Sequence, residues 1–112
     1  SAIMAENRKY WWDLAGLREY YIAKRSADRE IRCTKLDYTI VQPCRLTNGD
    51  STGKFIHANK AEADFAEHIE IARQDVALFI KEALLHPKET SRKTIPLVNG
   101  DVPVNDFIKE LA

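Results

Sequence analysis

The sequence predicts an α/β fold, because helix-like and strand-like segments alternate along its 112 residues. Residues 14–36 contain no proline and predict one long helix. Residues 37–43 are rich in β-branched and aromatic side chains and predict a strand that stops at Pro43. Residues 73–86 predict a second helix, which Pro87 ends, and a short strand and a final helix follow.

The long helix is the element on which the functional argument depends. Asp13 is placed to cap it, and Gly16 is a weak point near its start. One stripe recurs at spacings of three and four and comprises Leu17, Tyr20, Lys24, Ala27 and Ile31. The strand that follows lacks clean alternation of polar and apolar residues, which indicates cover on both faces, as in a parallel sheet.

The middle of the chain has weaker signals. Residues 47–53 are loop by composition, and residues 54–58 and 68–72 are short strand candidates around a polar insert from Asn59 to Glu67. The helix at residues 73–86 has an apolar stripe of Val76, Phe79, Ile80, Ala83 and Leu84.

The end of the chain predicts a strand and a helix. Residues 93–101 read as a short strand with Asn99-Gly100 as its turn. The last helix follows a proline in its first turn and places its apolar residues at helical spacing; these are Val104, Phe107, Ile108 and Leu111.

Composition limits the classes of function. With 45% hydrophobic and 30% charged residues, we expect residues 1–112 to form a single soluble segment. Seventeen basic residues balance seventeen acidic ones, which disfavours nucleic acid and membranes as partners. No apolar run could span a bilayer and no leader is evident, so we expect a cytoplasmic protein. Cys33 and Cys44 lack metal-binding spacing and the histidines are scattered, so no metal site is expected.

Three adjacent aromatic residues precede the long helix. Tyr10, Trp11 and Trp12 either pack beneath the helix or form the wall of a ligand pocket. Core packing is favoured, because adjacent aromatic residues that enter a helix usually bury against it.

Tyr20 and Lys24 are the candidate catalytic pair. Residues four apart lie on one face of a helix, about 6 Å apart along its axis. A tyrosine has an ordinary pKa near 10, so acid/base work near neutrality requires positive charge that stabilises the phenolate. Lys24 supplies part of that charge, and a nicotinamide ring would supply more. The alternative is a solvated helix face, because such a spacing also arises by chance.

The ordered motifs EYYIAKRSAD, LDYTIVQPCRLTN, GKF, IARQDVALFIKEALLHP and KTIPLVNGD resemble the C-terminal half of an atypical short-chain dehydrogenase/reductase, more narrowly the NmrA-like, NAD(P)-binding, epimerase-type subgroup. The resemblance implies the C-terminal part of a Rossmann-type, doubly wound parallel sheet. The nucleotide-binding N-terminal half is absent, because no G-x-x-G-x-x-G turn occurs among the four glycines.

The resemblance also implies roles for individual residues. Tyr20 would be the acid/base, and Lys24 would bind the ribose of NADP or NAD. Ser1 either matches the serine that orients the substrate carbonyl or is an extraneous first residue. The cofactor would lie near Pro43, Cys44 and Arg45, and the substrate loops would include Trp11, Trp12 and Asn48.

Three departures from the subgroup pattern leave alternatives open. Gln42 and Cys44 stand where the subgroup commonly has arginine and glycine, Ala72 stands where a serine commonly caps a helix, and the glycine-rich turn is missing. An NmrA-like NAD(P) sensor or partner-binding protein without turnover is therefore the alternative to an oxidoreductase or epimerase. A homodimer through the long helix is also open, as is a small module that offers its arginines to an acidic partner or to nucleic acid.

Overall fold

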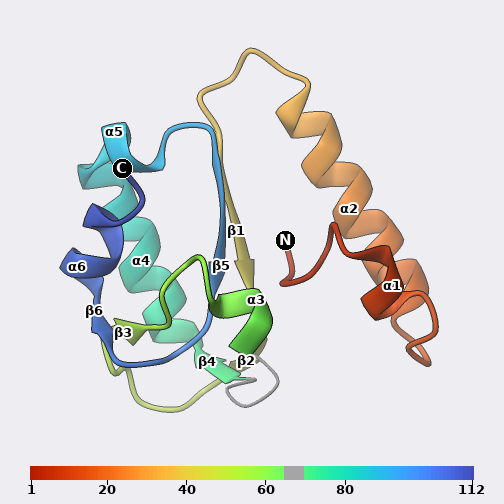
Figure 1. The fold of residues 1–112 in the computed structure, drawn as a ribbon, viewed down its shortest axis with the longest axis horizontal. Coiled ribbons are helices and arrows are strands. Elements are labelled where there is room, and N and C mark those ends of the chain that lie inside the picture. The colour runs from red at the N-terminus through yellow and green to blue at the C-terminus, as the bar shows by residue number, and fades with distance from the viewer. Residues whose placement is uncertain (65–69) are drawn as a thin grey trace.

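The computed structural model describes residues 1–64 and 70–112 (Figure 1). The helices are α1 (Arg8–Trp11), α2 (Arg18–Arg32), α3 (Ala61–Asp64), α4 (Arg73–Leu85), α5 (Pro87–Thr90) and α6 (Val104–Lys109). The strands are β1 (Thr39–Pro43), β2 (Arg45–Thr47), β3 (Lys54–Phe55), β4 (Glu70–Ala72), β5 (Lys93–Leu97) and β6 (Val102–Pro103). No helix in the described part of the chain is both long and apolar enough to cross a bilayer.

The central pair of strands is parallel, as the sequence predicted. β1 and β5 run in register from Thr39 opposite Lys93 to Pro43 opposite Leu97. β2 continues the line of β1 and pairs in parallel with β4, whereas β3 and β6 form an antiparallel pair. The α/β fold class is therefore confirmed, and α4 lies in the crossover connection that the parallel pair of β1 and β5 requires.

Residues 1–3 add a third strand-like segment beside β1. The Ser1 nitrogen donates to the Val41 carbonyl and the Ile3 nitrogen to the Pro43 carbonyl, each at 3.0 Å. Bonds two residues apart on both segments are the spacing of a parallel ladder. Cys44 donates instead to Leu97 of β5, so residues 1–3 lie on the opposite edge of β1 from β5.

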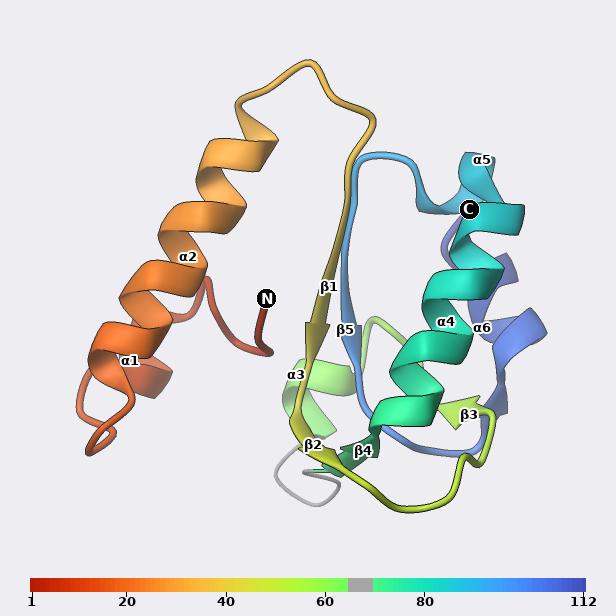
Figure 2. The same cartoon turned by 180° about the vertical axis from the view of Figure 1, so that it is seen from behind.

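Helices cover both faces of this sheet. Figures 1 and 2 show α2 on one side of β1 and β5, and α4 with α6 on the other. The main core contains Phe55, Phe79 and Phe107, whose ring centroids lie 5.1 to 6.2 Å apart. A smaller core under α2 contains Trp11 and Tyr21.

The long helix is shorter than the sequence predicted. It spans residues 18–32 and not 14–36. Gly16 takes a left-handed φ of 77°, so the residues before it cannot continue into the helix. Asp13 does not cap it, since Leu17 is the N-cap residue and provides no side-chain bond. At the other end, the Thr34 hydroxyl donates to the Ile31 carbonyl, which satisfies one of the last helical acceptors.

The predicted stripe is not the buried face of α2. Leu17, Tyr20 and Ile31 are 42%, 47% and 39% exposed, whereas Tyr21 and Asp28 are buried. The buried face differs from the apolar stripe because it carries two residues with polar groups, Tyr21 and Asp28. These groups form hydrogen bonds with residues 1–3 and β1, so apolar side chains alone do not determine which face is buried.

The second helix was predicted at nearly its observed position. Pro87 ends α4 and opens the short helix α5, and Ala72 precedes α4 without a side-chain cap. Phe79 and Ala83 are buried as predicted, but Ile80 and Leu84 are exposed. That half of the stripe was wrong, because only the residues over the phenylalanine cluster face the core.

The remaining elements follow the prediction in outline. β5 ends before the Asn99-Gly100 segment, and Phe107, Ile108 and Leu111 at the C-terminus are buried. Within the polar insert, α3 is a short helix that was not predicted. The strand candidate at 68–72 is β4 over its last three residues, while its first two residues and positions 65–67 of the insert lie outside the described residues.

Candidate functional site

Tyr20 and Lys24 lie one turn apart on α2 and are in contact. The Lys24 Nζ atom is 5.3 Å from the centroid of the Tyr20 ring. Tyr20 is 47% exposed and Lys24 is half-buried, so both side chains reach the surface on one side of the helix. The structure thus brings this predicted pair together, although their catalytic roles stay a prediction.

Tyr21, the neighbour of Tyr20, is a structural residue. Its hydroxyl donates to the Ile3 carbonyl at 2.9 Å, and its ring stacks on Trp11 with centroids 5.7 Å apart. Burial raises the pKa of Tyr21 to about 12, and the nearby Tyr10 and Tyr20 act in the same direction. Of the two adjacent tyrosines, Tyr20 alone offers an exposed phenol for acid/base chemistry.

Ser1 is exposed and bonds to a buried polar pair, Asp28 and Gln42, under α2. Its hydroxyl donates to Asp28 Oδ2 at 2.6 Å, and the Gln42 amide donates to the same oxygen at 3.1 Å. Asp28 is only 4% exposed. These bonds join α2 to residues 1–3 and β1, and they direct the Ser1 hydroxyl proton toward Asp28. Gln42, which stands where the subgroup commonly has an arginine, therefore faces the helix.

The predicted cofactor residues follow one another at the carboxyl end of β1. The Pro43 carbonyl accepts the bond from Ile3, and Arg45 forms an exposed ion pair with Glu70. Cys44 is in the main core, where burial raises the pKa of its thiol to about 11, although a hydrogen bond with its own backbone acts in the opposite direction. Carboxyl ends of parallel strands are the usual ligand edge of such sheets, and contact with a cofactor there stays a prediction.

The predicted substrate-loop residues have separate environments. Trp11 is 1% exposed and its indole donates to the Ala5 carbonyl at 3.0 Å, so it packs in the core as favoured and has almost no surface for a ligand. Trp12 is partly exposed beneath two arginines, Arg8 and Arg18. Asn48 accepts a bond of 2.7 Å from Arg73 at the start of α4.

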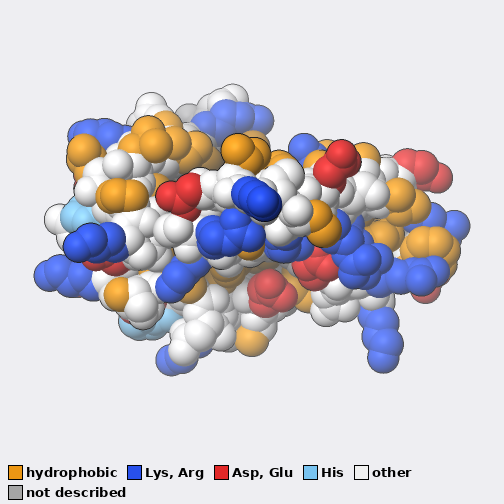
Figure 3. Space-filling model, turned by 90° about the horizontal axis from the view of Figure 1, so that it is seen from above, with side chains coloured by type: hydrophobic (Ala, Val, Ile, Leu, Met, Phe, Trp, Pro, Cys, Tyr) orange, Lys and Arg blue, Asp and Glu red, His pale blue; other side chains and the backbone are white. Residues whose placement is uncertain are grey.

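The basic residues of α2 are partly neutralised. Glu6 pairs with Arg25 and Arg29 at 3.5 Å each and with Arg32 at 2.7 Å. Burial opposes ionisation of Glu6, but its arginine partners prevail and hold its pKa below the usual value. Lys and Arg side chains still outnumber acidic ones across the middle of the face seen in Figure 3.

A buried aspartate that the sequence argument missed organises the loops beside the sheet. Asp75 in the first turn of α4 is fully buried and accepts five hydrogen bonds. The donors are the Ser51 hydroxyl, the Thr52 nitrogen and hydroxyl, the Gly53 nitrogen and the Asn99 amide. Burial by itself raises the pKa of Asp75, but these bonds outweigh burial and lower the pKa below 3.8. The sequence held one sign of this network: an aspartate in the first turn of a predicted helix and, elsewhere in the chain, a loop rich in hydrogen-bond donors.

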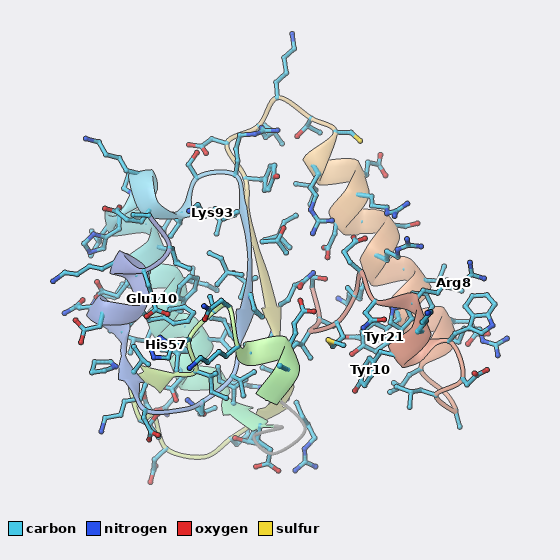
Figure 4. All side chains as sticks on the ribbon, viewed as in Figure 1. Arg8, Tyr10, Tyr21, His57, Lys93 and Glu110 are labelled. Atoms are coloured by element: carbon cyan, nitrogen blue, oxygen red, sulfur yellow. The ribbon has the colours of Figure 1, made fainter. Side chains whose placement is uncertain are left out.

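Two small cavities lie on the α6 side of the sheet. Both are open to solvent; one has a volume of about 500 Å³ beside Asn99, and the other has about 320 Å³ beside Lys93. His57 lines both, and its Nδ1 atom lies 2.6 Å from Glu110 Oε2 (Figure 4). No α2 residue lines either cavity, so neither belongs to the Tyr20 and Lys24 face.

Comparisons with known proteins agree with this architecture. A family described as NAD(P)H-binding matches residues 1–87. The Saccharomyces cerevisiae protein YMR090W (UPF0659) is 52% identical over 99% of this chain and 49% of its own. YhfK of Bacillus subtilis, named an uncharacterized sugar epimerase, is 36% identical over 99% of this chain and 48% of its own. The crystal structure of the oxidoreductase ylbE from Lactococcus lactis matches with a TM-score of 0.83 and 32% identity, over 99% of this chain and 49% of that one.

These matches confirm the resemblance seen in the sequence. The chain spans about half the length of the relatives it matches. Its parallel strands and flanking helices are those of a partial Rossmann-like domain, and the family match supports a nicotinamide dinucleotide as the cofactor. The chain therefore belongs to the NAD(P)H-binding family.

Proposed function

We propose that the complete protein is an NAD(P)-dependent oxidoreductase or epimerase, in which Tyr20 is the general acid/base and Lys24 binds the cofactor ribose. The observation that carries this proposal is the division between adjacent tyrosines. Tyr21 is buried and its hydroxyl donates a hydrogen bond to the Ile3 carbonyl, whereas Tyr20 is exposed beside the Lys24 ammonium group. The names of the relatives YhfK and ylbE, an epimerase and an oxidoreductase, agree with the reaction class.

The residues present fit one side of a nicotinamide dinucleotide. Residues 1–3, β1 and β5 run in parallel, so their carboxyl ends meet at one edge, where such cofactors bind. Lys24 would hold ribose hydroxyls, and Pro43 and Arg45 would border the ring. Because the Cys44 side chain is buried, that residue would contribute through its backbone. When bound, the dinucleotide supplies hydride transfer.

Tyr20 would manage the proton that accompanies this chemistry. As a substrate alcohol is oxidised, its hydroxyl proton passes to the Tyr20 oxygen, and the same proton returns when a carbonyl is reduced. Lys24 assists because its positive charge stabilises the phenolate form of a tyrosine one turn away. For an epimerase, Tyr20 would take the proton in the first half-reaction and return it in the second.

The arrangement of Ser1 favours a second candidate, an NAD(P) sensor without turnover. A serine that orients a substrate carbonyl must offer its hydroxyl proton to that carbonyl. In this structure the Ser1 proton is directed at Asp28 under the helix. A sensor needs the cofactor contacts of Lys24 but needs neither the serine nor the Tyr20 proton.

The test uses the complete protein and compares Tyr20→Phe with Tyr21→Phe. Aldose and ketose sugars are incubated with NAD or NADP. The absorbance of the reduced nicotinamide reports oxidation of the sugar, and the incorporation of deuterium from the solvent reports proton exchange. We expect Tyr20→Phe to lower the rate by about a hundredfold or more, with unchanged NADPH affinity, while Tyr21→Phe retains the rate. Full activity in Tyr20→Phe would falsify the catalytic role. Saturable cofactor binding with no turnover in any variant supports the sensor.

A further inference from the structure

Trp12 gathers two arginines at the junction of α1 and α2. The Cζ atoms of Arg8 and Arg18 lie over its ring, 4.1 and 4.6 Å from the centroid. Arg18 also donates from Nε to the Trp12 carbonyl at 2.7 Å, which fixes its side chain. Figure 4 shows Arg8 projecting at the outer end of the molecule, near Tyr10 and Tyr21.

The positive charge of this pair is not balanced within the described residues. Neither Arg8 nor Arg18 forms an ion pair there, whereas the arginines farther along α2 share Glu6. Both guanidinium groups lie within 5 Å of one ring centre, so they are closer together than the Debye length of about 10 Å at 0.1 M salt. The two charges therefore repel each other, and an anion between or beside them would relieve that repulsion.

The arginine pair is linked to the proposed acid/base by packed rings. Trp12 contacts Trp11 with ring centroids 6.0 Å apart, and Trp11 stacks on Tyr21 at 5.7 Å. Tyr21 in turn contacts Tyr20 edge-on at 5.6 Å. Arg18 and Tyr20 are two residues apart in the first turn of α2, so their side chains project from different sides of the helix. The arginine pair is therefore a separate cationic site at the start of α2.

We propose that Arg8 and Arg18 form a site for the phosphate group of a phosphorylated small molecule. Two guanidinium charges match the dianion of a phosphate monoester at pH 7 better than the single charge of a carboxylate. The cofactor is the other source of phosphate, but its pyrophosphate belongs on a glycine-rich turn that these 112 residues lack.

The experiment titrates inorganic phosphate into the complete protein saturated with NADP, at constant ionic strength. The indole N–H signal of Trp12 is followed by NMR and assigned with Trp12→Phe. We expect a saturable shift of this signal with phosphate. Glucose 6-phosphate should compete with phosphate for the site, and glucose should not. Arg8→Gln and Arg18→Gln should each raise the phosphate Kd by about tenfold. Arg29→Gln, which removes the same charge farther along the exposed face of α2, should change it less than twofold.

Three results would overturn the proposal. The first is no saturable shift with phosphate, and the second is an equal loss of affinity in Arg29→Gln, which indicates a diffuse charge effect. The third is a loss of NADP affinity in Arg8→Gln and Arg18→Gln with phosphate binding unchanged, which assigns the arginines to the cofactor. Phosphate binding requires no turnover, so these results are independent of whether Tyr20→Phe loses activity.

Discussion

Burial separates the chemistry of side chains that are adjacent in the sequence. Tyr20 and Tyr21 are the same residue type on the same helix, yet Tyr21 is 6% exposed and hydrogen-bonded to Ile3, while Tyr20 is 47% exposed. Cys44 is likewise buried whereas Cys33 is exposed. Ionisation of a buried side chain places a charge where water solvates it poorly, which costs free energy. Each buried residue should therefore differ from its exposed counterpart in how readily it ionises.

Tyr21 should make folding stability depend on alkaline pH. Its pKa is raised from 10 to about 12 in the folded chain, so its contribution is complete below pH 10 and is lost as the pH rises toward 12. We expect the free energy of unfolding to fall by up to about 2 kcal/mol over that window. Urea unfolding at several pH values would measure it. Tyr21→Phe should show a smaller fall, and equal falls in both proteins would contradict the assignment.

The two thiols should react at different rates. Cys33 is exposed, whereas burial raises the pKa of Cys44 to about 11 and removes it from reagents. With an aromatic disulfide reagent at pH 8, we expect Cys33→Ser to remove a fast phase of the native protein. Cys44→Ser should leave that phase intact and remove one that appears only in denaturant. A fast native reaction that depends on Cys44 would show that its thiol is accessible.

At the scale of elements, Asp75 connects three segments that are distant in the sequence. It lies in the first turn of α4 and accepts bonds from the loop at Ser51, Thr52 and Gly53 and from Asn99 beyond β5. These segments flank the carboxyl ends of the strands, which form the usual ligand edge of open α/β sheets. Asp75 therefore acts as a positioning residue for the loops of that edge.

Removal of the Asp75 charge should be costly. We expect Asp75→Asn to lower the free energy of unfolding by about 3 kcal/mol, because a buried carboxylate with five donors is replaced by a group that must itself donate. Asp101→Asn, at an exposed position beyond β5, should change stability by less than about 0.5 kcal/mol. Thermal or urea unfolding measures both variants, and similar losses in the two would contradict the role of Asp75.

The same carboxylate gives a prediction for acid. Because the folded pKa of Asp75 lies below 3.8, its stabilisation is complete above that pH and is lost as the pH falls through the lowered value. The acid limb of the stability curve should thus be shallower in Asp75→Asn than in the unchanged protein. Equilibrium unfolding between pH 5 and 2 provides the comparison, and identical limbs would show that other groups control acid unfolding.

Local signals predicted the elements, and long-range contacts decided their faces. Pro43 and Pro87 marked the ends of β1 and α4 because proline acts on its own backbone. The contact of Tyr20 with Lys24 follows from a spacing of four on one helix. That Tyr21 is buried depends on where Ile3 lies, and the Asp75 network depends on three loops, so neither could be read from neighbouring residues.

At the scale of the whole molecule, we propose that the chain supplies one side of a dinucleotide site. Residues 1–3, β1 and β5 form parallel neighbours, and α2 presents Tyr20 and Lys24 from one side of them. Relatives of about twice the length match it along nearly all of its residues. None of its four glycines belongs to a G-x-x-G-x-x-G turn, which is the feature that normally receives the pyrophosphate.

Cofactor affinity should therefore depend on chain length. Trp11 and Trp12 lie beside α2 and can transfer excitation energy to a bound reduced nicotinamide. We expect no saturable transfer when micromolar NADPH is added to this 112-residue chain, with far-ultraviolet circular dichroism confirming that it is folded. The complete protein should saturate, because backbone N–H groups at a helix N-terminus then bind the pyrophosphate. Saturable transfer in the 112-residue chain would instead mean that these residues build a whole dinucleotide site, with Lys24 and the strand ends carrying the affinity.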